Sequence, residues 1–293
     1  MLRERVSDLD ALVEYYNILT LKDIRSYNRI TAMMEKHPRE LRQLFCGIGA
    51  LDAAIAILSF RKSLPFFCLP EFSSESRIDM EAIYHPLLRE PVPNSVELDK
   101  NSLVSGSNAS GKSTFIKATA LCGIFAQTIH TCTARRYKTR FSLVMTSMAV
   151  RDNILANESY FITEIKSVRR ILQKISEVYC TCYIDEILKG TNTVERIGAS
   201  VSVLKHLHSL DCLCVVATHD IELTQLLSGC YDNFHFCEQM NDNGIGFDYR
   251  IRTGPSHTRN AILLLDYLDF PESIVQEARF LVDRFEHTQN WND

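Results

Sequence analysis

The chain has 293 residues, of which 46% are hydrophobic and 23% charged, and these proportions are typical of a soluble globular protein. Its formal net charge of −4 gives no general attraction to nucleic acid, so any DNA contact must come from a local patch or a larger assembly. We find no apolar run of the roughly 18 residues that a membrane helix needs and no apolar stretch at the N-terminus, which predicts a cytoplasmic protein without a membrane span.

The first part of the chain is predicted to be helical. Apolar residues recur at helical spacing in two stripes, from Leu9 to Leu19 and from Leu41 to Leu58. Such stripes indicate packing and carry no chemistry of their own. Prolines then interrupt the pattern, so residues 1–70 are predicted to form a separate helical segment.

Strands and helices alternate from residue 96 onward, which predicts an α/β fold with a mostly parallel sheet flanked by helices. The short apolar runs at 179–184 and 213–217 are typical of buried strands. Residues 234–236 and 247–251 are expected to pair as a hairpin. This α/β domain is expected to occupy residues 71–270, and a C-terminal helix over 271–293 is a candidate dimer contact.

Two further patterns are assigned to structure and not to chemistry. The basic cluster at residues 135–140 is predicted to be a solvated loop. The ten cysteines contain no C-x-x-C pair, and the C-x-C pairs at 180–182 and 212–214 lie in strand-like runs. Reduced, buried thiols are therefore expected in place of a metal site or disulfides.

The segment from Gly106 to Ser113 fits the phosphate-binding pattern G-x-x-x-x-G-K-[ST]. In this pattern, backbone N–H groups wrap a phosphate chain, the lysine reaches the β- and γ-phosphates, and the last hydroxyl ligates Mg²⁺. A predicted strand precedes the loop and a predicted helix follows it, which places a helix N-terminus at the phosphates. We expect the nucleotide to contact Gly106, Ser107, Asn108, Ala109, Ser110, Gly111, Lys112, Ser113 and Thr114.

Two acidic residues follow the predicted strand at 179–184. Asp185 is predicted to hold Mg²⁺ together with Ser113, and Glu186 to orient or deprotonate the attacking water. The next buried strand ends just before His219, which is predicted to hydrogen-bond the γ-phosphate. Glu186, His219 and the P-loop Lys112 are therefore the candidate catalytic residues.

These motifs resemble the C-terminal ATPase domain of the MutS mismatch-repair proteins, within the ABC-type ATPase class. The run D-E-I-L-K-G-T-N-T at 185–193 is similar to the family's D-E-I-G-R-G-T-S-T, and A-T-H-D-I-E-L-T at 217–224 matches its A-T-H-x-x-E-L-T. Residues 158–165 resemble the family's S-T-F-M-x-E-M element. The resemblance covers roughly residues 40–285.

The resemblance implies a P-loop ATPase that uses ATP and Mg²⁺ and acts in DNA mismatch repair or a related DNA transaction. It also implies a homodimer formed through the ATP site, in which Ser159 contacts the nucleotide of the partner subunit. Residues 1–70 resemble the end of the family's lever helices. The chain has no room for a mismatch-reading domain, so we expect either a fragment of a longer protein or a bare ATPase that works with partners on duplex DNA.

The sequence departs from the family at several positions. Ser107, Ala109 and Ser110 replace the proline, methionine and glycine of the family's G-P-N-M-G-G-K-S-T, which indicates a divergent branch. Val92 lies about where the family stacks an aromatic side chain on adenine. Tyr249 is therefore predicted to contact the base in its place.

Alternative functions remain open at the level of sequence. A transporter-type ATP-binding subunit would need an L-S-G-G-Q signature and a helical insertion between residues 112 and 185, and the sequence has neither. A nucleotide-gated assembly module without turnover would need the same binding residues and no hydrolysis. An ABC-type ATPase that does not act on DNA is a further alternative.

Overall fold

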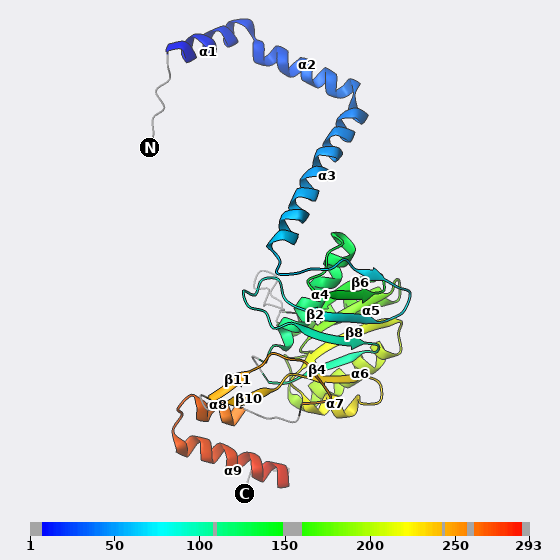
Figure 1. Cartoon of the computed structure of the whole chain (residues 1–293), viewed down its shortest axis with the longest axis vertical. Helices are drawn as coiled ribbons and strands as arrows, with labels where there is room; N and C mark the ends of the chain where they lie inside the picture. Colours follow the sequence, from blue (N-terminus) through cyan, green and yellow to red (C-terminus); the bar gives the residue numbers. More distant parts are fainter. Residues whose placement is uncertain (1–7, 108–109, 149–159, 242–243, 257–260, 289–293) are drawn as a thin grey trace. The chain divides into compact units, whose positions relative to one another are not determined.

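The computed structural model describes residues 8–107, 110–148, 160–241, 244–256 and 261–288 (Figure 1). It divides into two compact units, residues 1–63 and residues 64–293. The first unit is helical, and the second combines helices with sheets. The prediction of an α/β fold is therefore confirmed.

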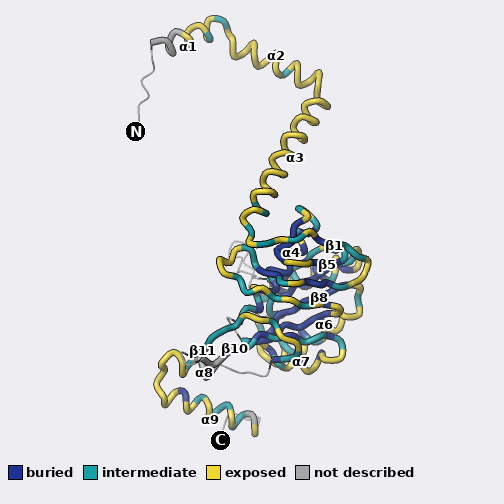
Figure 2. The backbone as a smooth tube through the Cα atoms, in the orientation of Figure 1, coloured by how far each residue is buried: buried dark blue, intermediate teal, exposed yellow. Residues whose placement is uncertain are grey.

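The N-terminal unit consists of helices over its described residues, as the apolar stripes predict. They are α1 (Asp8–Thr20), α2 (Lys22–Lys36) and α3 (Pro38–Ser63). Leu21 adopts the left-handed conformation with φ of 48° and separates α1 from α2, and Pro38 opens α3, where a missing N–H costs no hydrogen bond. Neither α2 nor α3 buries a residue, and both run exposed through this unit (Figure 2).

Helix α3 corrects the expectation that no segment is apolar enough for a membrane span. By length and composition alone, it is long enough and apolar enough to cross a membrane, and none of that stretch is buried. Counting only uninterrupted apolar runs misses it, because Gly47, Gly49 and Asp52 break the run without lowering the mean hydropathy much. Core helices of soluble proteins also meet this criterion.

The second unit is built on a six-stranded sheet. Its strands are, in spatial order, β12 (Arg252–Thr253), β9 (Asp232–His235), β4 (Ser102–Ser105), β8 (Cys212–Thr218), β7 (Cys180–Asp185) and β6 (Leu143–Ser147). Every neighbouring pair is parallel except β12 with β9. The carboxyl ends of β4, β8 and β7 therefore lie at one edge of the sheet.

Helices cover both faces of this sheet (Figure 1). They are α4 (Lys112–Thr128), α5 (Tyr160–Ile175), α6 (Thr193–His208) and α7 (Ile221–Leu226). Successive residues of β8 point to opposite faces, so Val215 packs in the hydrophobic cluster of α4 and Val216 in the cluster that contains Leu204 of α6. The central strands are buried on both sides, as expected for continuous apolar runs between helices.

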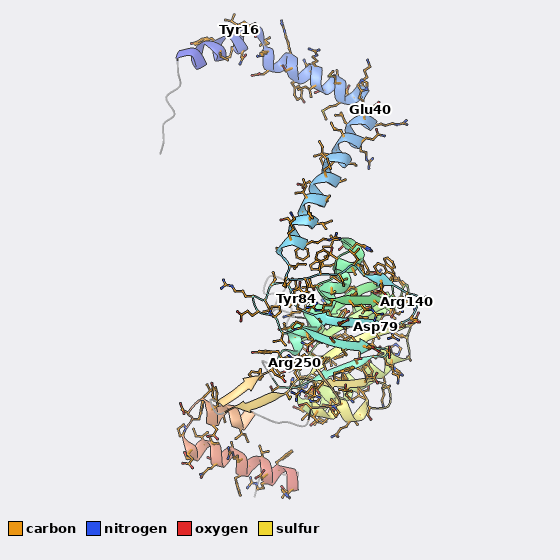
Figure 3. All side chains as sticks on the ribbon, in the orientation of Figure 1. Tyr16, Glu40, Asp79, Tyr84, Arg140 and Arg250 are labelled. Carbon is orange, nitrogen blue, oxygen red and sulfur yellow. The ribbon has the colours of Figure 1, made fainter. Side chains whose placement is uncertain are left out.

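A second, mixed sheet packs beside the first and includes a strand that the sequence did not predict. Its strands are, in spatial order, β1 (Glu71–Phe72), β5 (Arg136–Thr139), β2 (Ile78–Ile83) and β3 (Asn94–Leu98). The predicted solvated loop at 135–140 is wrong, because β5 pairs with β2 and alternates buried Tyr137 and Thr139 with outward basic residues. Arg140, labelled in Figure 3, lies over the ring of Tyr179 with 3.9 Å to the centroid.

The predicted hairpin of 234–236 with 247–251 is also wrong in its pairing. The hairpin consists instead of β10 (Glu238–Asn241) and β11 (Gly244–Phe247), which pair antiparallel. Strand β9 pairs instead with the distant β12. Two helices follow, α8 (Ala261–Tyr267) and α9 (Glu272–Thr288), and Pro271 precedes the second of them as predicted.

The two C-x-C pairs are small core residues, as expected. Cys180 and Cys182 lie on β7, Cys212 and Cys214 lie on β8, and each is at most 8% exposed. Because alternate strand residues share a face, each pair packs on one side of the sheet, in the cluster that also contains Leu204.

Candidate functional site

The fold brings three predicted groups to one edge of the six-stranded sheet. Strand β4 runs into the loop 106–111 and then into α4, β7 ends at Asp185, and β8 ends one residue before His219. Since these strands are parallel neighbours in the order β4, β8, β7, their carboxyl ends lie next to one another. Groups that lie far apart in the sequence therefore meet at the N-terminus of α4.

The loop before α4 needs glycine at its two ends. Gly106 has φ of 138° and Gly111 has φ of 109°, both in the region that favours glycine. A Cβ at Gly106 would also lie 2.6 Å from the carbonyl oxygen of Phe236. Asn108 and Ala109, two of the predicted phosphate contacts, lie outside the described residues.

Ser110 and Lys112 place polar groups inside this loop. Ser110 is 1% exposed, and its buried Oγ has no hydrogen-bond partner within the described part of the chain. Lys112 is 4% exposed, and its Nζ donates to the carbonyl oxygens of Gly106 (2.7 Å) and Ser107 (2.6 Å). A buried hydroxyl and a buried ammonium in one loop fit a phosphate group, because each can donate to its oxygens. Thr114, the next residue but one, is exposed.

The two predicted metal ligands contact each other. Ser113 Oγ donates to Asp185 Oδ1 at 2.9 Å, across a sequence separation of 72 residues. A hydroxyl and a carboxylate offer the hard oxygen donors that Mg²⁺ prefers, and both lie beside the phosphate-binding loop. The donor set therefore fits Mg²⁺.

Glu186 and His219 lie side by side, and Lys189, a residue to which sequence reasoning gave no role, joins them. His219 Nδ1 lies 3.3 Å from Glu186 Oε1, and Lys189 Nζ forms an ion pair with Glu186 Oε2. The hydrogen bond from His219 and the ammonium of Lys189 lower the pKa of Glu186 to about 2, against the opposing effect of partial burial. The signal for Lys189 was its place in the 185–193 motif, three residues after Glu186.

A buried ion pair supports His219 from its other side. His219 Nε2 lies 3.7 Å from Asp220 Oδ1, and Asp220 accepts from Arg196 Nε and Nη2 at 3.0 and 2.6 Å. The side chains of Arg196 and Asp220 are 13% and 8% exposed. This bidentate pair fixes the residue next to His219 and thereby the start of α7.

A cavity of about 490 Å³ opens beside the candidate phosphate-binding loop that precedes α4. Tyr249 and Val92 both line it, together with His85 and Glu186. Asn94 Nδ2 donates to the carbonyl oxygen of Tyr249 at 2.9 Å, which anchors the tyrosine beside Gly111. The structure therefore brings the predicted base contact to the cavity. His85 was not assigned from sequence, and burial lowers its pKa.

Helix α5 contacts the turn that follows Asp185. The carboxylate of Glu164, which is 2% exposed, accepts from the backbone N–H of Lys189 at 3.2 Å. A Cβ at Gly190 would lie 2.8 Å from the Cβ of Phe161, so the helix and the turn approach closely there. Ser159, predicted to act on the partner's nucleotide, lies outside the described residues, just before α5.

Comparison with known proteins decides the family. Residues 102–286 match the family model described as MutS domain V. The chain belongs to the MutS family. The matched residues of this MutS domain V contain the candidate phosphate-binding loop, the acidic pair and His219, so the family resemblance inferred from these motifs is confirmed.

Relatives of this MutS-family chain include two bacterial proteins and one from mouse. The "DNA mismatch repair protein MutS" of Thermus caldophilus is 27% identical over 279 residues, covering 92% of this chain and 33% of the relative. "MutS protein homolog 4" of Mus musculus is 32% identical over 271 residues, covering 86% of this chain and 28% of the relative. A "DNA mismatch repair protein MutS" of Lactobacillus delbrueckii is 25% identical over 295 residues, covering 94% and 34%. The chain thus spans about a third of the length of these MutS relatives.

Proposed function

We propose that this MutS-family chain has a P-loop NTPase fold, binds ATP with Mg²⁺ and hydrolyses the ATP. The observation that carries the proposal is the hydrogen bond from Ser113 to Asp185, with Glu186 and His219 beside it. It joins a hydroxyl at the start of α4 to a carboxylate at the end of β7, beside the loop that would hold the phosphates. Phosphoryl transfer needs positioning and charge neutralisation above all, and these residues supply both.

Nucleotide binding uses the loop and the cavity. Gly106, Ser107, Asn108, Ala109, Ser110, Gly111, Lys112, Ser113 and Thr114 would surround the phosphates. Lys112 would transfer its hydrogen bonds from the loop carbonyls to phosphate oxygens, a change that keeps the buried ammonium paired. Tyr249 would contact the base from the wall of the cavity.

Hydrolysis depends on the groups at the strand ends. Ser113 and Asp185 would hold Mg²⁺, which neutralises charge that develops on the phosphate oxygens. Glu186 would accept a hydrogen bond from the attacking water and orient it. His219, held between Glu186 and Asp220, would donate to the γ-phosphate.

The wider role follows from the family. We propose that the chain acts in DNA mismatch repair or a related transaction on duplex DNA, since relatives named for mismatch repair cover most of this chain. Ser159 would complete the ATP site of a partner subunit, which makes the active form a homodimer. Nucleotide state would then couple the dimer to the helices of residues 1–70. The mismatch-reading function would reside elsewhere in an assembly, and the chain would work in the cytoplasm.

The test is ATP hydrolysis as a function of protein concentration, with Glu186→Gln as the control and with duplex DNA present or absent. We expect specific activity to rise with concentration, because each site needs a partner residue, and to collapse in the variant. Stimulation by DNA would support the role in DNA transactions. ATP binding without hydrolysis at every concentration would instead identify a nucleotide-gated assembly module.

A further inference from the structure

Both carboxylate oxygens of Glu186 are engaged by other side chains. Oε1 contacts His219 Nδ1 at 3.3 Å, and Oε2 forms the ion pair with Lys189 Nζ. The Glu186 side chain is 14% exposed and lines the candidate nucleotide cavity, whereas the Lys189 side chain is 52% exposed. The carboxylate is thus held between a fixed histidine on one side and a solvent-exposed lysine on the other.

The turn that carries this ion pair is strained. Glu186 and Leu188 have φ of 60° and 56°, a region that residues with a Cβ rarely adopt. Such strain persists only where surrounding contacts hold the backbone in place. Backbone contacts do so at both ends, since Glu186 N–H donates to the carbonyl oxygen of Ala217 at 3.0 Å and Lys189 N–H to Glu164 at 3.2 Å. The ion pair joins the side chains of Glu186 and Lys189 across the same turn.

We propose that Lys189 is a positioning residue that restrains Glu186, and that turnover requires Lys189 to release the carboxylate. The inference rests on the proposed ATPase function and adds a control element to that site. While the ion pair is formed, Oε2 is directed at the turn, so it has to rotate before it can orient a water at the nucleotide. The backbone anchors of the turn stay in place during this rotation, because they involve other atoms.

The exposure of Lys189 makes the release attainable. Water can solvate the ammonium once it leaves Glu186, and ion pairs with an exposed partner are weak. His219 is less free to move, because Asp220 on its far side is held by Arg196. Of the two contacts on Glu186, the lysine contact is therefore the one that opens and closes.

The experiment compares the full chain with Lys189→Met, Lys189→Gln and Lys189→Arg under saturating ATP and Mg²⁺. We expect both uncharged variants to raise kcat by about threefold, the size that a weak ion pair allows, with KM for ATP within about twofold of wild type. Lys189→Arg keeps the charge and should keep the wild-type kcat. Lys205→Met, which removes an exposed lysine of α6 far along the helix, is the matched control and should change nothing.

The dependence of kcat on salt concentration distinguishes a restraint by Lys189 from a purely structural role of this residue. Raising KCl from about 0.05 to about 0.5 M shortens the screening length from above 10 Å to a few ångströms and weakens an exposed ion pair. We expect kcat at saturating ATP to rise with salt in the wild type. In Lys189→Met the rise should be absent, because the screened pair no longer exists.

The outcomes separate this inference from the proposed function. The restraint alone would be overturned by the following result. The kcat of the wild type is higher than that of Glu186→Gln, and Lys189→Met and Lys189→Gln bind a fluorescent ATP analogue but have a kcat no higher than that of the wild type. If the wild type and both uncharged variants all show no turnover above Glu186→Gln, the ATPase function and the restraint both fail.

Discussion

The ion pair between Arg196 and Asp220 stabilises the site from within the protein. Its two hydrogen bonds join α6 to the start of α7, and both side chains are nearly buried. A charge that is buried with its partner becomes a large cost when that partner is removed. The pair therefore contributes to folding and also fixes the backbone next to His219.

The first prediction concerns this pair. Arg196→Met should lower the free energy of unfolding by about 3–5 kcal/mol, because it leaves the carboxylate of Asp220 buried and unpaired. Arg169→Met, on the exposed side of α5, should change it by less than about 0.5 kcal/mol. Urea unfolding followed by far-ultraviolet circular dichroism measures both. Equal losses of unfolding free energy in the two variants would show that the pair of Arg196 and Asp220 stabilises the fold no more than an exposed arginine does.

Glu186 gives a prediction for the dependence of stability on pH. Its pKa falls from 4.5 to about 2 on folding, so the folded state binds fewer protons than the unfolded state in between. The stability contributed by this carboxylate is fully present above pH 4.5 and is lost as the pH falls toward 2. The difference in unfolding free energy between wild type and Glu186→Gln should therefore shrink between pH 6 and pH 3 in urea titrations. A difference that grows toward low pH would contradict the depressed pKa.

At the scale of elements, α5 and the turn after β7 behave as one unit. Glu164 binds the backbone of this turn, and Phe161 packs against Gly190, which has no space for a side chain. Burial raises the pKa of Glu164 despite the backbone N–H groups that oppose the shift. The helix that begins after Ser159 is thus joined to the residues that follow Asp185 and Glu186.

Two glycine substitutions test this contact. Gly190→Ala should lower the free energy of unfolding by about 1–3 kcal/mol, because its Cβ would clash with Phe161. Gly198→Ala, within α6 and with no atom within 4 Å of the added Cβ, should raise it by about 0.5–1 kcal/mol through helix propensity. Thermal unfolding of the two variants reports the opposite signs. A stabilising Gly190→Ala would mean that α5 does not press on the turn.

The sequence predicted those elements whose signal is local. The run from Leu213 to Ala217 is apolar throughout and predicts a buried strand, and the glycines at 106 and 111 mark a turn with positive φ. Strand β5 was missed because two buried residues alternate with basic ones over only four positions. The pairing of β9 with β12 depends on residues that lie far apart in the chain, and no local pattern encodes it.

The same distinction holds within the candidate site. The loop residues and the acidic pair follow from a motif and its spacing, and the contact of Ser113 with Asp185 agrees with it. Lys189 lies inside the 185–193 motif, but the motif does not say which side chain its ammonium contacts, and Arg196 is a single charged residue on a helix face with no pattern of its own. Their partners are set by how the strand ends and α6 come together in three dimensions.

At the scale of the whole molecule, the hydrophobic core lies entirely in one of the two units. Every buried apolar residue among those described belongs to residues 64–293, whereas α2 and α3 bury none. The N-terminal unit instead exposes large apolar side chains such as Phe45 and Leu51. Such a surface in a folded protein marks a site of interaction.

Removal of residues 1–63 tests this division. The remaining chain should keep its free energy of unfolding within about 0.5 kcal/mol, since α2 and α3, which make up most of the removed segment, contribute no buried side chain. It should also stay soluble at higher concentration, because the exposed apolar helices are gone. Urea unfolding and light scattering on the full and shortened chains measure the two effects. A large loss of stability would show that the helices contribute to the core.

The position of Lys112 has a consequence for affinity. Its ammonium donates hydrogen bonds to the carbonyl oxygens of Gly106 and Ser107. These two oxygens therefore compete with any phosphate for the same ammonium. The apparent dissociation constant of a nucleotide is then the intrinsic constant divided by the fraction of molecules in which the hydrogen bonds from Lys112 to these carbonyl oxygens are broken. Two chains with identical contacts to ATP can thus differ widely in affinity, according to how firmly each loop holds its own lysine.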